Sequence, residues 1–373
     1  MIIINKKIGQ VRVSFTPSFY KTAYQNYENG YYREIIAMMK RATIDSQVAG
    51  CLLGRKAGFQ REFSLTPYDS DNQKDQENTT WVANMIGQLN MRQLFKAIHE
   101  AVLFRYSVID PVWEIIDNRQ VVTGFNKIDQ KYFRYKDDEL KIDFGKDLRD
   151  IPDDALVCES HETPVMLPVL RDYILKEFGL ESWAGFIETF GEGIIIGKYP
   201  PGADNEIKAA LEQAVTDIAG ASRGIMPDNT EIDVKGYESR IGSHDKFIDA
   251  ADKGISISIL GHENAVAQSK GLQVGENISS YKVKREIAVD DMYFIDEQMN
   301  KFLRNIWDRN FGDGRYPIFA LDKSEPINIS ERLEVLDQYY RQGGKIDPAH
   351  YSELGIRVMD DQEPLQVKDG LLG

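Results

Sequence analysis

The sequence has too few cysteines and histidines for several common kinds of site. Of 373 residues only two are cysteines, Cys51 and Cys158, and only five are histidines. Two cysteines cannot build a disulfide framework or a cysteine-ligated zinc site. Because each lies in an apolar stretch, we expect both to be buried, reduced thiols.

Long apolar runs are also missing. No stretch approaches the roughly 18 consecutive apolar residues of a membrane-spanning helix, so we expect no membrane contact. The opening MIIINKKIGQVRV places two lysines after a short apolar run, which reverses the order found in a secretion signal. These features predict a cytoplasmic protein.

Positive charge is in deficit. The 45 Lys and Arg face 59 Asp and Glu, for a formal net charge of −14. Proteins that coat duplex DNA neutralise phosphates with clustered cations, so this balance argues against such a coat. It is typical of an ordinary acidic globular protein, and it also suits the wall of a passage through which DNA slides without adhering.

Motifs for catalysis are lacking. GEGIIIGKY (191–199) superficially resembles a phosphate loop, but five residues separate Gly191 from Gly197 and three separate Gly193 from Gly197, where the motif needs four between its glycines. Tyr199 replaces the hydroxyl residue that binds the metal ion. No G-x-S-x-G motif occurs. We therefore predict no catalytic residues and no cofactor.

Two His-Glu pairs are the remaining candidates for a metal site. ESHETP places His161 beside acids, and GHEN does the same for His262. Neither has the i, i+4 histidine spacing of a metal-binding helix. Surface or turn residues are the simpler interpretation, and we predict no metal.

The periodicity of apolar residues predicts an α+β protein. A helix over 167–190 leads into a short isoleucine strand at 194–196, a turn, and a helix over 205–219. Before it we expect helices at 31–42, 44–57 and 79–104, the last in two pieces with Asn90 as a cap. We then expect a strand meander with hairpin turns at Asp117-Asn118 and Asp137-Asp138. Residues 1–30, 69–78 and 147–154 show no regular pattern.

The second half of the chain alternates hairpin, helix and loop patterns. A hairpin is expected over 223–237, a helix over 243–251, and a strand over 254–260, where Ile and Ser alternate. A polar stretch follows over 262–279, then the longest helix over 280–311, and a last helix over 330–341. Lys282, Lys284 and Arg285 fall in the first turns of the longest helix, where cations oppose the helix dipole. Nearby DNA phosphate would explain them, as would a solvated mobile loop with ordinary surface lysines.

Several motifs occur in an order that resembles the portal proteins of Mu-like bacteriophages. The signals are W-x-x-F-I-E-x-F-G (183–191), G-K-Y (197–199), the polar stretch with its long helix, and RLEVLDQYYRQGGKIDPAHYSELGI (332–356). The resemblance covers about 33–356. One departure is Arg105-Tyr106, which stands where glycine is common in the family.

The resemblance implies a portal protomer, elongated and built from several parts, that assembles into a ring. The implied parts are an N-terminal arm (1–30), an α+β wing (31–162), stem helix 1 (163–192), an α/β clip (193–240), stem helix 2 (241–256), a tunnel loop (257–279), a long wing helix (280–320), and a short helical crown with the tail (321–373).

The resemblance also implies partners and site residues. The ring, dodecameric in this family, would occupy one capsid vertex of the virion, beside the major capsid protein, after assembly in the host cytoplasm. Double-stranded DNA would pass through it, and the clip would meet the terminase large subunit and then the head-tail connector. Residues near DNA would be Gln268, Lys270, Gln273, Lys282, Lys284 and Arg285. Clip interface residues would be Lys198, Tyr199, Arg223 and Asp228.

Two alternatives remain at this point. One is a metal- or nucleotide-dependent hydrolase without a recognisable motif, and the other is a non-viral oligomeric scaffold. A hydrolase would bring acid, base or metal-binding residues together in one pocket.

Overall fold

A computed structural model describes residues 11, 13–144, 147–190, 194–217, 222–227, 237–263, 274–312 and 314–324. The chain divides into two units, Met1–Asp322 and Lys323–Gly373, and the described residues belong almost wholly to the first. The expected helix at 330–341 and nearly all of the expected crown lie outside the described residues.

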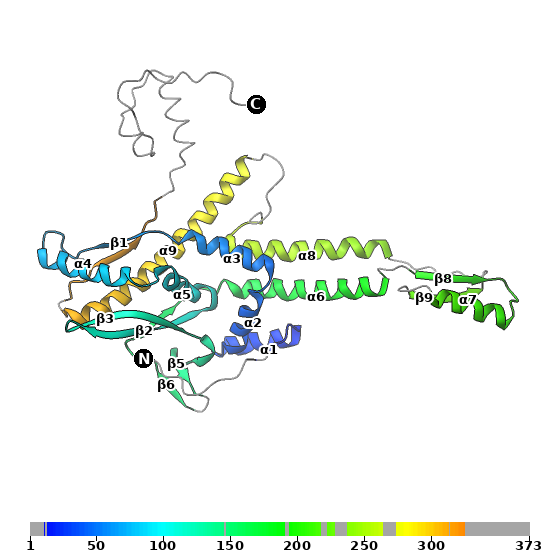
Figure 1. Ribbon diagram of the computed structural model, residues 1–373, viewed down its shortest axis with the longest axis horizontal. Coiled ribbons are helices and arrows are strands. Elements are labelled where there is room, and N and C mark those ends of the chain that lie inside the picture. Colours follow the sequence, from blue (N-terminus) through cyan, green and yellow to red (C-terminus); the bar gives the residue numbers. More distant parts are fainter. Residues whose placement is uncertain are drawn as a thin grey trace, which may run out of the picture. The chain divides into compact units, whose positions relative to one another are not determined.

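Helices and strands alternate irregularly along the first unit (Figure 1), as the predicted α+β class requires. The helices are α1 (Pro17–Glu28), α2 (Arg33–Ala42), α3 (Ser46–Gly58), α4 (Gln73–Gly87), α5 (Met91–Phe104), η1 (Gln130–Tyr132), α6 (Met166–Phe190), α7 (Asn205–Asp217), α8 (Tyr237–Leu260) and α9 (Val274–Asn310). The strands are β1 (Phe63–Thr66), β2 (Tyr106–Ile116), β3 (Arg119–Ile128), β4 (Phe133–Lys136), β5 (Glu139–Asp143), β6 (Leu148–Asp150), β7 (Leu156–Glu159), β8 (Ile194–Tyr199), β9 (Ser222–Pro227) and β10 (Ile318–Leu321).

The longest hairpin joins β2 and β3 in a sheet of order β3-β2-β7. Its turn residues Asp117 and Asn118 have φ of 49° and 61°, so the predicted turn is confirmed and is of the primed type. Pro111 lies inside β2, where it would usually break a ladder. Strand β7 pairs only with Tyr106–Ile109, so the second edge of β2 is unpaired at Pro111.

Three smaller sheets complete the strands. β4, β5 and β6 form an antiparallel meander, and its predicted turn at Asp137 and Asp138 is confirmed by φ of 52° and 60°. β1 pairs antiparallel with β10, which joins segments far apart in the sequence. β8 pairs in parallel with β9, and α7 connects them.

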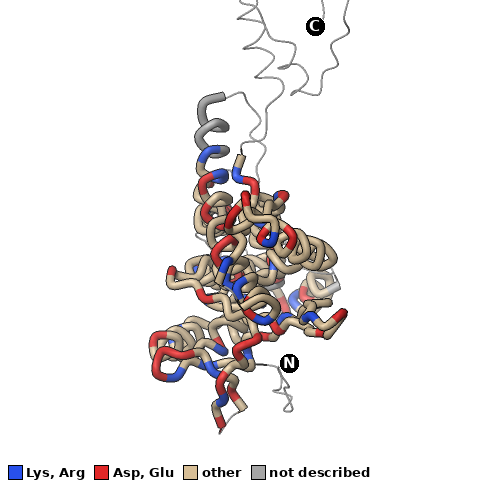
Figure 2. Tube along the Cα trace, turned by 90° about the vertical axis from the view of Figure 1, so that its left-hand side faces the viewer, with Lys and Arg blue, Asp and Glu red and all other residues tan. Residues whose placement is uncertain are grey.

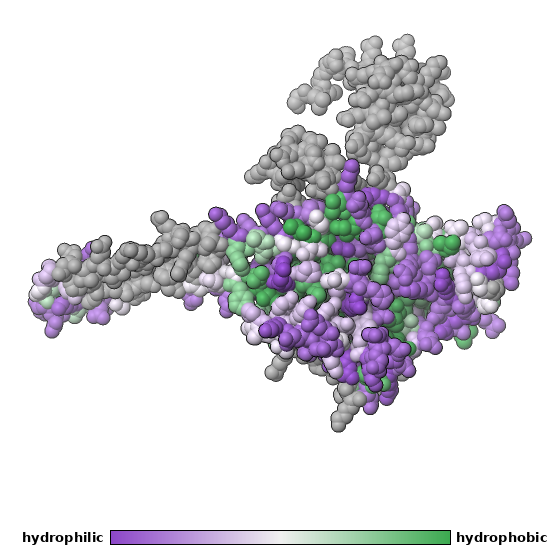
Figure 3. Space-filling model, turned by 180° about the vertical axis from the view of Figure 1, so that it is seen from behind, coloured by the Kyte–Doolittle hydropathy of each residue, from purple (hydrophilic) through white to green (hydrophobic). Residues whose placement is uncertain are grey.

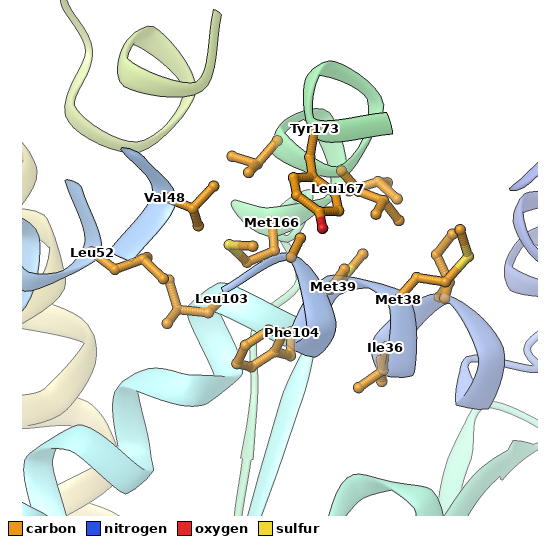
Figure 4. Packing of buried hydrophobic residues seen from close by; sticks show 14 of the residues in the cluster. Ile36, Met38, Met39, Val48, Leu52, Leu103, Phe104, Met166, Leu167 and Tyr173 are labelled. Carbon is orange, nitrogen blue, oxygen red and sulfur yellow. The ribbon is translucent and has the colours of Figure 1, made fainter. Parts of the chain in front are cut away.

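Two clusters of buried apolar side chains hold the unit together. The first gathers residues of α2, α3, α5 and α6 with the end of α8, and Figure 4 shows part of it, including Met38, Leu52, Leu103 and Met166. The second packs α4, α5 and α9 against β2 and β10 around Trp307, which is fully buried. Because α3 and α5 reach toward both clusters, they connect the paired helices α6 and α8 with α9.

Helix starts agree with the capping residues in the sequence. Asp45 accepts hydrogen bonds from the backbone of Gln47 and Val48 at the start of α3, and Asn90 caps α5 as predicted. The stretch 69–78 is not wholly a loop. Asn72 caps α4, which starts at Gln73, and the buried Asp75 in its first turn pairs with Arg315.

Three predictions of secondary structure were wrong. Residues 254–260 are not a strand but the last turns of α8: Ile255 and Ile259, one turn apart, are fully buried, and Ile257 between them is 47% exposed. The longest helix starts at Val274, not 280, so Lys282 is its ninth residue. Residues 17–28 form α1, which Thr16 caps and Pro17 opens.

The expected hairpin over 223–237 is only partly within the described residues. Its first strand, β9, pairs in parallel with β8, and residues 228–236 lie outside the described ranges. Residues 237–240 already belong to α8. The acidic stretch 147–154 contains the short strand β6, since Leu148 pairs with Asp143 of β5.

Candidate functional site

Helices α6 and α8 lie side by side and run in opposite directions (Figure 1). Two glycines let them approach. A Cβ added at Gly179 would lie 2.8 Å from the ring of Phe247, and one added at Gly254 would overlap the carboxylate of Asp172. Gly179 therefore serves close packing between the two helices.

A buried lysine joins this helix pair to α3. Lys176 on α6 is 8% exposed, and its Nζ lies 2.8 Å from Asp45 Oδ2 and 2.7 Å from Asp252 Oδ1 on α8. Burial alone would lower the pKa of Lys176, but the hydrogen bonds and charges of Asp252 and Asp45 raise it above its ordinary value. The lysine is therefore charged, with two carboxylates around it.

Asp45 makes two kinds of contact where α3 meets the helix pair. Its Oδ1 caps α3, and its Oδ2 binds Lys176. Two residues further along, Gln47 donates a 2.7 Å hydrogen bond to Ser256 of α8. The N-terminal end of α3 is thereby attached to both α6 and α8.

The C-terminal half of α3 holds α8 and α9 together. Arg55 pairs with Asp291 of α9 through Nε–Oδ2 and Nη2–Oδ1 contacts of 2.9 Å each. Its Nη1 donates a 3.0 Å hydrogen bond to the carbonyl of Ile259 in the last turn of α8. One side chain thus binds both helices that flank residues 261–273.

His99 on α5 completes this buried group. Its Nε2 lies 3.0 Å from Asp291 Oδ2, and its ring packs on Phe59 at 4.5 Å. Burial lowers the pKa of His99, although Asp291 opposes that shift. Burial raises the pKa of Asp291, but His99 and Arg55 lower it more, so the carboxylate is charged.

A cavity of about 150 Å³ opens between α3, the end of α8 and α9. Its basic residues are Arg55, Arg61, Lys284 and Arg285, and its apolar walls include Leu260 and Ile287. None of the described residues that line it is acidic. His262 follows the end of α8, and burial, together with the nearby charge of Lys284, lowers its pKa.

The candidate metal and thiol residues have structural surroundings. Among the described residues, no three His, Cys, Asp or Glu side chains are placed to hold a metal ion. Glu159 accepts a hydrogen bond from Tyr135, beside His161 in a polar cavity of about 530 Å³. Cys51 and Cys158 are both buried and unpaired, as predicted.

A helix crosses a membrane only if it is both long enough and apolar enough. None of the described helices, within the ranges given above, meets both requirements.

Comparison with known proteins shows the family to which this chain belongs. The chain is 32% identical to the portal protein of Escherichia phage Mu over 162 residues, which is 42% of this chain and 29% of that protein. It is 34% identical over 92 residues to the Mu-like prophage FluMu protein gp29 of Haemophilus influenzae, covering 24% and 17% of the two chains. The model of the family "Portal protein of Mu bacteriophage" matches residues 36–356. The chain belongs to this portal family.

The fold of the portal chain is also found among solved structures. The protein in "Neck of empty GTA particle computed with C6 symmetry" matches 94% of this chain and 97% of its own, with a TM-score of 0.51 at 10% identity. The match therefore supports the α+β fold. The aligned stretches span less than a third of the curated relatives given above.

The residues expected near DNA are only partly described. Lys284 and Arg285 line the cavity between α3 and α9, whereas Lys282 is exposed. Gln268, Lys270 and Gln273 lie outside the described residues. Because α9 starts eight residues before Lys282, these cations are not in its first turns, and the helix-dipole argument for them was wrong. Sequence reasoning missed Arg55 and Arg61, whose only signal was a basic run at the end of a helix.

The expected clip residues lie on the unit formed by β8, α7 and β9. Lys198 is exposed at the end of β8, and Lys208 of α7 lies 5.3 Å from the Tyr199 ring. Gly197 lets α7 pack onto the strand, since a Cβ there would lie 2.9 Å from Val215. Arg223 lies in β9, and Asp228 lies outside the described residues.

The departure at Arg105 has a backbone explanation. Arg105 follows α5 with φ of 89°, a conformation that favours glycine. The glycine expected at this position from the family resemblance therefore suits the turn from α5 into β2. In this chain Arg105 instead donates a hydrogen bond to the carbonyl of Glu162.

Proposed function

We propose that the chain is one subunit of a portal ring at a single vertex of a bacteriophage capsid, through which double-stranded DNA is packaged and ejected. The observation that carries this proposal is the family match over residues 36–356. The paired helices α6 and α8, about 37 Å long at 1.5 Å per residue, are suited to the stem of such a ring.

The parts of the protomer follow from this assignment. We assign the wing to residues 31–162 together with α9, the stem to α6 and α8, and the clip to β8, α7 and β9. The clip would meet the terminase large subunit during packaging and the head-tail connector afterwards. The major capsid protein would surround the wing.

DNA handling is assigned to the segment between α8 and α9. Since α8 continues to Leu260 and α9 starts at Val274, the proposed tunnel loop is 261–273. Arg55 supports the assignment because it binds the carbonyl of Ile259 at the end of α8, just before the segment, and ties it to Asp291 in the middle of α9. A loop that meets moving DNA needs such anchors if it is to transmit force to the ring.

The decisive experiment is native mass spectrometry with negative-stain microscopy of the purified chain, alone and co-produced with the capsid and scaffolding proteins of its phage. We expect a closed ring of about a dozen copies with a central hole. A chain that remains monomeric or dimeric in both settings would contradict the proposal. No observation in the described residues favours the hydrolase or the non-viral scaffold.

The role of the loop is tested separately. Deletion of residues 268–275 should impair DNA packaging while rings still assemble. Replacement of the same eight residues by glycine and serine keeps the length and separates the need for a loop from the need for its side chains. Normal packaging by the deletion variant would remove the loop from the proposed function.

A further inference from the structure

The cavity between α3 and α9 gathers positive charge in a chain with a net charge of −14. Arg55 is paired with Asp291, and Arg61, Lys284 and Arg285 bring three further cations to the rim. We call this set, with the apolar walls Leu260, Ile287 and Ala288, the basic socket. A cavity of about 150 Å³ is large enough for one side chain and smaller than the roughly 300 Å³ and above of cofactor pockets.

The opposite side of α9 carries the complementary charge. Glu286, Asp290 and Glu297 are exposed carboxylates on this side, and Glu297 also pairs with Lys301. The uncharged Tyr293 lies among them, 60% exposed. With about 100° between successive helical residues, they lie roughly opposite Lys284 and Ala288. We call them the acidic stripe. Figure 2 shows both signs of charge along the described part of α9.

The chemistry of the socket favours a protein side chain as its occupant. A phosphate group would meet cations but also the apolar surface of Leu260 and Ile287, which gives it no hydrogen bonds. A glutamate or a tyrosine has an apolar stem that contacts such walls and a polar end that reaches the arginines. Figure 3 shows apolar patches set among hydrophilic surface on one face of the molecule.

We propose that the basic socket of one copy binds the acidic stripe of a second copy of this chain. The proposal rests on the proposed ring and names the surfaces that would close it. Because socket and stripe are different surfaces on opposite sides of one helix, the contact is head-to-tail, and such contacts generate rings. Copies that each carry −14 repel one another overall, and a concentrated positive site facing an acidic surface offsets that repulsion locally.

The test uses two neutralising variants of the full chain. Arg61→Gln with Arg285→Gln disables the socket, and Glu286→Gln with Asp290→Asn disables the stripe. We expect each variant alone to raise the protein concentration needed for assembly by about tenfold or more. Circular dichroism and urea unfolding check that both variants remain folded. A matched control, Lys96→Gln with Arg92→Gln on exposed positions of α5, should assemble as the wild type does.

Mixing the two variants provides the sharper readout. Each retains one working surface, so an equimolar mixture should form one-to-one heterodimers and nothing larger by native mass spectrometry. Charge reversal of both surfaces in one chain, Arg61→Glu and Arg285→Glu with Glu286→Lys and Asp290→Lys, should restore larger assemblies.

Three outcomes would overturn the inference. If the wild type forms rings and both neutralised variants do too, the surfaces are wrong while the proposed function stands. If the socket variant assembles but loses salt-dependent binding of a short DNA duplex, the socket binds phosphate instead. A wild type that stays monomeric, even with its capsid and scaffolding proteins, overturns both the inference and the proposed function.

Discussion

Arg55 and Asp291 form a two-pronged ion pair between α3 and α9, with both N–O distances at 2.9 Å. The carboxylate is 2% exposed and the guanidinium 10%. The two residues are 236 positions apart, and the same arginine binds the carbonyl of Ile259. Arg55 therefore connects α3 with the end of α8, where the proposed tunnel loop begins, and with the middle of α9.

Replacement of Arg55 by methionine should lower the free energy of unfolding by about 3–5 kcal/mol, because it leaves a buried carboxylate without its cation. Urea unfolding followed by circular dichroism measures the change. The double variant Arg55→Met with Asp291→Leu should cost less than the single one, since no buried charge remains. Lys301→Met is the matched control, because its partner Glu297 is 62% exposed, and it should cost under about 1 kcal/mol. Equal effects of Arg55→Met and the control would refute this account.

Gly254→Ala should destabilise the chain although alanine is the better helix former. The added Cβ would overlap the Asp172 carboxylate and push α6 and α8 apart. Gly50→Ala is the control: Gly50 lies in α3 with nothing within 4 Å of its added Cβ, so it should stabilise by about 0.5–1 kcal/mol. Thermal melting of both variants shows directly whether each substitution raises or lowers the melting temperature. A stabilising Gly254→Ala would mean that the helices are not in close contact there.

His99 makes stability depend on pH near neutrality. Burial lowers its pKa, so below about pH 6.5 the unfolded chain binds a proton that the folded chain does not. The contribution of neutral His99 to the free energy of unfolding is therefore fully present above pH 6.5. It falls as the pH drops below that value, by up to about 1.4 kcal/mol per pH unit. Urea midpoints at pH 7.5 and 5.5 measure this slope. His99→Gln should flatten it, and His161→Gln, at an exposed position, should leave it unchanged.

Arg105→Gly should stabilise the chain by about 1 kcal/mol despite the loss of a side chain. The position has φ of 89°, which costs a residue with a Cβ about 1–2 kcal/mol. That gain exceeds the exposed hydrogen bond from Arg105 to Glu162, which is lost. Arg105→Ala is the control, because it loses the same bond and keeps the Cβ, and it should not stabilise. A higher melting temperature for Arg105→Ala than for Arg105→Gly would contradict the strain argument.

Sequence patterns were reliable where local chemistry decides the structure. The pairs Asp117-Asn118 and Asp137-Asp138 predicted two hairpin turns, because these residues accept positive φ at little cost. Asn90 predicted a helix start, since a short side chain can accept a hydrogen bond from the backbone two or three residues ahead. Each of these signals spans four residues or fewer.

The errors lie where packing between distant segments decides. The Ile-Ser alternation over 254–260 fits a strand by itself, but Ile255 and Ile259 are buried one helical turn apart, and Ser256 binds Gln47 of α3. The aromatic stretch over 17–28 has no clear period, and it forms a helix whose Tyr27 packs on Tyr32 at the start of α2, which in turn packs on Tyr135 of β4. The local sequence pattern of neither stretch shows the distant residues against which it packs.

The sequence by itself determined the α+β class, the acidic charge, the buried cysteines and, through the order of its motifs, the portal family. Only the tertiary structure showed that Lys176 joins three helices, that Arg55 ties the end of α8 to α9, and that Arg61 meets Lys284 and Arg285 at one cavity. The reason is physical. A cap or a turn is stabilised within a few residues, whereas a buried ion pair exists only once helices from distant parts of the chain have excluded water around it.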